Sequence, residues 1–123
     1  MKQKSKESSR HVEAVLKALA ILDCFEIQQN LKVKQIHEMT KLNQSRILRL
    51  CGTLESMGYL IHDCDTGLYS LGPRVLSLGK IYELNNTLIS LARPVLKKLA
   101  RITGESASIY VVDGIKRLCL VRE

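Results

Sequence analysis

The sequence lacks the residue patterns that mark several kinds of functional site. Its four cysteines, Cys24, Cys51, Cys64 and Cys119, lie far apart, without a C-x-x-C pair or a paired-histidine motif that would complete a zinc site. It has no glycine-rich phosphate loop, and its three histidines stand alone rather than in a serine–histidine–aspartate arrangement. We therefore expect no enzyme activity, no metal and no cofactor. Cys24 and Cys51 fall on apolar helical faces and are expected to be core residues.

Long apolar stretches and acidic residues are also scarce. No run approaches the roughly 18 residues that mark a bilayer-spanning helix, and no signal peptide is recognisable. These absences predict a soluble, cytoplasmic protein without a membrane partner. The chain has 12 Asp and Glu against 19 Lys and Arg, a formal net charge of +7. Such an excess suits an anionic partner such as nucleic acid or a membrane surface, and solubility alone explains it equally well.

The apolar content is sufficient for a packed core. Hydrophobic residues make up 46% of the 123 positions, which allows one modest domain or a small domain with appendages. Residues 1–9 are mostly basic and polar, and they are expected to form a disordered tail.

A strong helical repeat follows at Val12–Phe25. Its apolar stripe consists of Val12, Val15, Leu16, Leu19, Leu22 and Phe25. Further apolar residues lie outside that stripe: Ala14, Ala18, Ala20 and Ile21. A helix that is apolar on several sides either lies fully buried within its own domain or has a second neighbour from another subunit. Both alternatives are open at this point.

The next segment has the pattern of a helix-turn-helix. Val33–Thr40 is predicted as a short helix, Lys41 and Leu42 as the turn, and Asn43 as the N-cap of a second helix. In the short helix the residues expected to face inward are Val33, Ile36 and Met39. In the second helix the core-facing side is predicted at helical spacing as Ile47, Leu50, Cys51, Leu54 and Met57.

The opposite side of this second helix is rich in hydrogen-bond donors. It carries Gln44, Ser45, Arg46, Arg49, Thr53 and Ser56. Side chains of this kind reach phosphates and base edges, so the helix is predicted to enter the major groove of DNA. Ser45 and the first-turn N–H groups would hold phosphate, Gln44 and Arg46 would read bases, and Arg49 would grip a phosphate or a base edge. An ordinary solvated helix face has the same composition, so this pattern alone does not decide.

A predicted hairpin strengthens the DNA-binding interpretation. Gly58 stands where a left-handed C-cap residue is expected, and Tyr59–His62 and Leu68–Leu71 have strand patterns around a turn at residues 63–67. A hairpin directly after a recognition-type helix is a wing. Thr66 is a candidate DNA contact near its tip, although the two aspartates of the turn make the tip a weaker phosphate binder than a basic one.

Two further helices are expected after the wing. Pro73 has the position of a first helical residue, and the helix is predicted to extend to Asn85. Thr87 is expected to cap the next helix, which Pro94 would kink or restart and which ends at Thr103. The residues of this helix predicted to face inward are Leu88, Leu91, Val95, Leu99 and Ile102. The broad apolar surfaces of the first helix and of the helix at residues 73–85 predict a homodimer.

The chain closes with a second predicted hairpin. Glu105–Val112 and Lys116–Arg122 read as strands around an Asp113-Gly114 turn. Two strands are marginal on their own, so this segment is expected to open a domain that is mostly absent. The predicted division is a disordered tail at 1–9, a winged helix-turn-helix domain at 10–72, a linker helix at 73–86 and the start of a truncated domain at 87–123. The fold class is α+β and mainly helical.

In this order and spacing, the patterns resemble the N-terminal part of the IclR family of bacterial transcription regulators, over about residues 10–123. The motifs that carry the resemblance are LNQSRILRL at 42–50, TLE at 53–55, GYL at 58–60, YSLGPRVL at 69–76, ARPVLKKLA at 92–100, TGE at 103–105 and VDG at 112–114. The resemblance implies a winged helix-turn-helix that binds DNA as a dimer, often with dimers pairing into tetramers. It also implies a linker helix and a C-terminal domain that senses a small molecule, often a carboxylic acid. Family members repress or activate, commonly at operons for carbon-source breakdown.

The sequence departs from the family pattern in the recognition segment. The family usually has Gly where Lys41 stands, often Pro-Lys or a similar pair at Asn43-Gln44, and Ser-Thr at Ser45-Arg46. Arg46 would read a guanine through O6 and N7 or grip a phosphate, so the operator cannot be inferred from relatives. Most of the effector domain is missing, as expected for a fragment or for a short gene product, and a small-molecule effector is expected only if a full C-terminal domain exists.

A second function class is compatible with the same residues. The chain would then be a winged-helix protein-interaction module without sequence-specific DNA binding. The acidic wing tip and the absent sensor domain favour this alternative, whereas Arg46 and Arg49 on one exposed face disfavour it.

Overall fold

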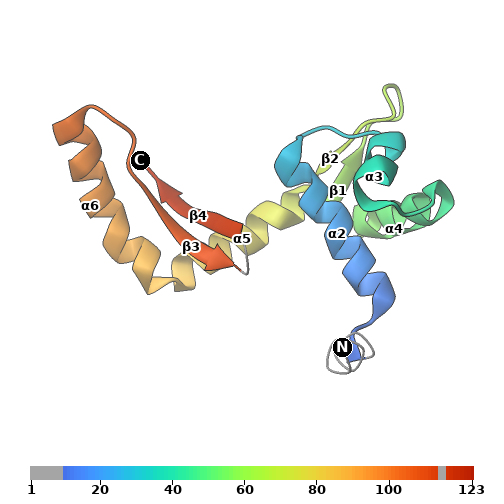
Figure 1. Cartoon of the computed structure of the whole chain (residues 1–123), viewed down its shortest axis with the longest axis horizontal. Coiled ribbons are helices and arrows are strands. Elements are labelled where there is room, and N and C mark those ends of the chain that lie inside the picture. Colours follow the sequence, from blue (N-terminus) through green and yellow to red (C-terminus); the bar gives the residue numbers. More distant parts are fainter. Residues whose placement is uncertain (1–9, 114–115) are drawn as a thin grey trace. The chain divides into compact units, whose positions relative to one another are not determined.

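The computed structural model describes residues 10–113 and 116–123, and the chain divides into two compact units, Met1–Ser77 and Leu78–Glu123 (Figure 1). The predicted tail at residues 1–9 and Gly114 of the predicted last turn lie outside the described residues. The boundary between the units falls within a helix, and the division predicted from the sequence remains a prediction. Helices followed by short hairpins confirm the expected α+β class and the winged helix-turn-helix.

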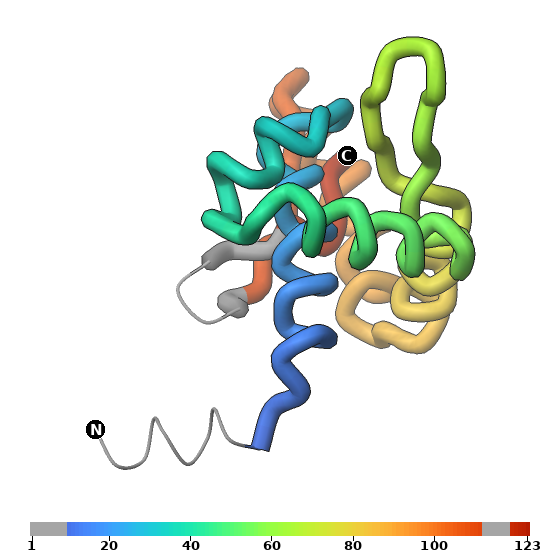
Figure 2. The backbone as a smooth tube through the Cα atoms, turned by 90° about the vertical axis from the view of Figure 1, so that its right-hand side faces the viewer, coloured from blue at the N-terminus to red at the C-terminus, as the bar shows by residue number. Residues whose placement is uncertain are grey.

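Between residues 10 and 72, the described part of the first unit contains three helices and a two-stranded sheet. The helices are α2 (Glu13–Ile27), α3 (Val33–Thr40) and α4 (Gln44–Ser56), and the strands are β1 (Leu60–His62) and β2 (Tyr69–Leu71). The strands pair antiparallel, and a backbone bridge from the α2–α3 connection, at Leu31, joins the outer side of β2. Figure 2 shows α4 crossing α2, with the hairpin extending as a narrow wing.

Each of these three helices and two strands contributes to one core. Its buried residues are Ile21, Cys24, Phe25, Leu31, Ile36, Ile47, Cys51, Leu60 and Tyr69. The expected burial of Cys24 and Cys51 is confirmed, and burial raises the pKa of the Cys51 thiol to about 11. The expected inward positions of Met39 and Met57 are wrong, with exposed fractions of 39% and 65%. Both residues lie at the C-terminal ends of their helices, beyond the reach of this core.

The described residues of the first unit leave the first half of α2 exposed. The exposed apolar residues there are Val15, Leu16 and Leu19, and Val12, the N-cap residue just before the helix, is exposed as well. The side of α2 that enters the core instead carries Ile21, Cys24 and Phe25. Full burial of this helix within one domain, one of the two alternatives open from the sequence, is therefore wrong.

The boundary helix α5 (Pro73–Asn85) has no buried residue. The second unit continues with α6 (Thr87–Thr103) and an antiparallel hairpin of β3 (Ser108–Asp113) and β4 (Lys116–Arg122). Its small core consists of Ile89, Ala92, Leu96 and Val121.

The sequence-based prediction for α6 was wrong in two respects. Asn86, not Thr87, caps the helix, because its Oδ1 accepts a hydrogen bond from the N–H of Ile89 at 3.3 Å. The inward face carries Ile89, Ala92 and Leu96. The face predicted to be inward is exposed: Leu88, Leu91, Val95, Leu99 and Ile102. The helix has two apolar stripes, and the hairpin packs against only one of them. Pro94 lies inside the helix without ending it.

Candidate nucleic-acid interface

The turn before α4 fixes where the recognition helix begins. Lys41 has a φ of 63°, in the left-handed region that glycine adopts without a Cβ penalty. The imidazole Nδ1 of His37 contacts the Leu42 carbonyl oxygen and braces the turn from α3. Asn43 then caps α4, because its Oδ1 accepts hydrogen bonds from the Arg46 N–H at 2.8 Å and from the Ser45 hydroxyl at 3.0 Å. The predicted N-cap is confirmed.

The donor-rich side of α4 faces solvent. Its exposed residues are Gln44, Ser45, Arg49, Thr53 and Ser56, and Arg46 is partly exposed. A hollow of about 690 Å³ follows this side and is lined by α4 residues between Ser45 and Ser56 and by Ala14 of α2. The opposite side of the helix buries Ile47 and Cys51. The helical period therefore separates a core side from an open polar side.

The polar residues of this face differ in their availability to a ligand. The Ser45 hydroxyl donates to Asn43, and the Thr53 hydroxyl donates to the Arg49 carbonyl oxygen at 3.1 Å. Within the described parts of the chain, the side chains of Gln44 and Arg49 have no hydrogen bond or ion pair. These two side chains are thus the most available for intermolecular contacts.

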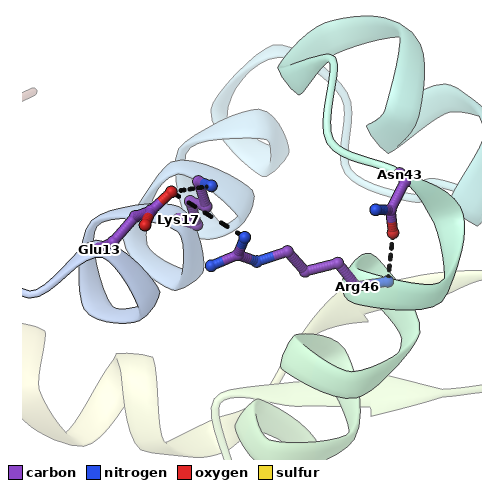
Figure 3. A network of polar contacts seen from close by, with 4 residues as sticks. All are labelled: Glu13, Lys17, Asn43 and Arg46. Carbon is purple, nitrogen blue, oxygen red and sulfur yellow. Dashed lines mark hydrogen bonds and ion pairs between the residues drawn. The ribbon is translucent and has the colours of Figure 1, made fainter.

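Arg46 makes an ion pair across to another helix (Figure 3). Its Nη1 lies 4.0 Å from Oε1 of Glu13 at the start of α2, and Lys17 also donates to this oxygen. The hydrogen bond from Lys17, followed by the charges of Lys17 and Arg46, lowers the pKa of Glu13. The predicted base reader is therefore half-buried at the edge of the face rather than freely extended.

Two residues on this face were missed by sequence reasoning. Leu48 is 52% exposed between the polar side chains, and Gly52 is exposed, with no atom within 4 Å of the point that a Cβ would occupy. Leu48 lies outside the core-facing stripe of α4, and that spacing was the available signal. An apolar side chain on such a face contacts the methyl group of thymine in many complexes.

The wing tip is held by its own polar groups. Asp63 Oδ1 accepts from the Asp65 N–H at 2.9 Å, and this hydrogen bond, together with one from Thr66, lowers the pKa of Asp63. Thr66 also accepts from the Leu68 N–H at 3.3 Å. The Thr66 hydroxyl is therefore already engaged, although the residue is exposed. In the strands, the ring of His62 stacks on Tyr69, with centroids 4.2 Å apart.

Other kinds of site have no support within residues 10–113 and 116–123. No group of three or more His, Cys, Asp or Glu residues is arranged to hold a metal ion there. No helix among those residues is long and apolar enough to cross a membrane.

These features define a class of protein. Three helices with a capped, outward-facing third helix and a two-stranded wing make a winged helix-turn-helix, a fold of DNA-binding transcription regulators. Residues 14–63 match the IclR helix-turn-helix domain. The chain belongs to the IclR family of transcriptional regulators, which is not a family of enzymes.

Known relatives agree with this assignment. The chain is 29% identical over 108 residues to the HTH-type transcriptional regulator BhcR of Paracoccus denitrificans, covering 88% of this chain and 39% of that protein. It is 31% identical over 109 residues to TsaQ1/TsaQ2 of Comamonas testosteroni, covering 89% and 39%. The chain thus spans about two-fifths of the length of these curated relatives.

Solved structures support the fold independently. An IclR family regulator from Brucella abortus superposes with a TM-score of 0.79 at 28% identity, covering 96% of this chain and 46% of that chain. An IclR regulator from Alicyclobacillus acidocaldarius gives a TM-score of 0.82 at 23% identity, covering 92% and 46%.

Proposed function

We propose that this protein is a sequence-specific transcription regulator that binds operator DNA as a homodimer, with α4 in the major groove and the wing beside it. The observation that carries the proposal is the open, donor-rich side of α4 opposite a side fixed in the core. Such a regulator acts on the chromosome, in the cytoplasm. Control by a small molecule is proposed only where a full C-terminal domain is present.

The N-terminus of α4 is the proposed phosphate site. Asn43 accepts a hydrogen bond from the backbone N–H of Arg46. The backbone N–H groups of Gln44 and Ser45 remain for a phosphate at the positive end of the helix. The Ser45 hydroxyl can turn from Asn43 to a phosphate oxygen. The net charge of +7 supplies the accompanying long-range attraction.

Base reading is assigned to side chains further around the same face. Gln44 and Arg49 supply donors without intramolecular competition, and Arg46 supplies a bidentate donor once it leaves Glu13. Leu48 is proposed to contact a thymine methyl group. Thr53 and Thr66 are proposed as phosphate contacts with smaller effects, because their hydroxyls already have partners.

Dimerisation is proposed to cover the exposed apolar residues of α2 and α5. Those of α2 and its N-cap are Val12, Val15, Leu16 and Leu19, and those of α5 are Leu76, Leu78, Ile81, Tyr82 and Leu84. Apolar surface of this extent is typical of an interaction site. Light scattering should give a dimer, and a monomer at high protein concentration would contradict this part of the proposal.

The test of DNA binding compares duplexes that the protein selects from a random pool with the unselected pool, at several salt concentrations. If Arg49 reads a base, Arg49→Gln should weaken binding to the selected duplex by about 1–3 kcal/mol. If Arg49 contacts a phosphate, the substitution should reduce the slope of log affinity against log salt concentration by about 1. Lys98→Gln, an equal charge change on an exposed residue of α6, is the matched control. Equal affinity for both pools would reject sequence-specific regulation. Capture of a protein partner that DNA does not displace would favour the alternative interaction module.

A further inference from the structure

The guanidinium of Arg46 points away from its own helix and toward α2 (Figure 3). Its Nη1 lies 4.0 Å from Oε1 of Glu13, and the same oxygen accepts a hydrogen bond from Lys17, one turn along α2. Ala14, the neighbour of Glu13, lines the hollow beside α4. A carboxylate of the first helix is therefore placed at the edge of the candidate DNA-binding face, between two cations.

The Glu13–Arg46 contact is weak enough to be exchanged for a stronger one. The Glu13 side chain is 69% exposed, and 4.0 Å is at the outer limit of an ion pair, so water screens the attraction. Phosphates and guanine edges offer a guanidinium shorter, charge-assisted hydrogen bonds. When Arg46 turns to DNA, Lys17 remains with the carboxylate. Glu13 therefore does not prevent binding, but it competes with DNA for Arg46.

We propose that Glu13 restrains Arg46 in the free protein and thereby lowers the affinity of the α4 face for DNA. Glu13 is a positioning residue that acts through Arg46. The inference rests on the proposed DNA-binding function. Every DNA complex that uses Arg46 must first give up the Glu13 contact, and the loss of this contact reduces the affinity. The restraint therefore originates from a helix that carries none of the predicted DNA contacts.

The test is a titration of a labelled short duplex of random sequence with the full chain at several salt concentrations. Glu13→Gln keeps the shape of the side chain and removes its charge, and it should bind roughly two- to fivefold tighter at low salt, the range of exposed ion pairs. The dependence on salt should become steeper by about one. Glu26→Gln removes the same charge from an exposed position at the other end of α2 and should change affinity less.

A double-mutant cycle separates the restraint of Arg46 from general repulsion. In an Arg46→Gln background, Glu13→Gln should lose its gain in affinity. A gain that persists there, or weaker binding by Glu13→Gln alone, would overturn the inference, because Glu13 would then act on DNA directly or align Arg46 for binding. If the unaltered chain binds no duplex at all, both the proposed DNA-binding function and the inference about Glu13 fail. If the unaltered chain binds DNA but Glu13→Gln does not bind tighter, only the inference about Glu13 fails.

Discussion

Replacing Gly72 with alanine is expected to destabilise the first unit. A Cβ at this position would lie 2.3 Å from the carbonyl oxygen of Gly58, 2.9 Å from its carbonyl carbon and 3.0 Å from the carbonyl carbon of Tyr59. All three are backbone atoms, so no side-chain rotation relieves the clash. The backbone must separate where the Gly72 N–H donates to Tyr59 at 2.8 Å and the Arg74 N–H donates to Gly58 at 3.0 Å. Overpacking of this kind costs about 1–3 kcal/mol.

The assay is urea unfolding followed through amide signals of β1 and β2, which report on the first unit alone. Gly79→Ala is the matched control, because Gly79 lies in α5 with nothing within 4 Å of its Cβ position. It should stabilise its helix by about 0.5–1 kcal/mol, the propensity difference between the two residues. An unchanged unfolding midpoint for Gly72→Ala would refute the reasoning that this close approach holds the wing to the start of α5.

Gly52, Asp63 and Cys51 provide three further tests. Gly52→Ala should raise the free energy of unfolding in urea by about 0.5–1 kcal/mol, because Gly52 lies in α4 with open space around its Cβ position. The same substitution should weaken DNA binding, because it adds a methyl group to the proposed DNA-binding face. Tighter DNA binding would contradict this prediction. Hydrogen bonds in the turn lower the pKa of Asp63 in the folded protein. The stability that Asp63 contributes to the wing is therefore present above its unfolded-state pKa and is lost as pH falls through the lower folded-state pKa. Titration of the carboxyl group by NMR should give a midpoint below that of the unfolded chain. Burial raises the pKa of Cys51 to about 11, so its thiol stays protonated near neutral pH and should resist alkylation, whereas the exposed Cys64 should react. Mass spectrometry at successive times would measure both alkylation rates. Equal rates for the two cysteines would contradict the buried position of Cys51.

The sequence determined the order of the elements and the orientation of α4. Ile47 and Cys51 recur at helical spacing, and an apolar stripe of that period has to face a core. The polar residues opposite this stripe are then left on the solvent side of α4. Asn43 and Gly58 marked the ends of α4 because capping depends on local backbone geometry, which short sequence patterns encode.

Only the tertiary structure decided how the apolar surfaces are used. On α6, two stripes satisfy the same helical period, and the choice between them depends on where the distant hairpin packs. On α2, Ile21 rather than Leu19 enters the core, because the choice depends on which side of α2 packs against the other elements of the first unit.

The tertiary structure likewise brought together groups that are far apart in the sequence. Glu13 meets Arg46 because α2 packs across α4, and Gly72 meets Gly58 because the wing returns to the end of α4. Sequence periodicity reports which side of an element is apolar, since that is a property of the element itself. Which partner a side chain meets depends on how the elements are packed, and that is a property of the whole unit.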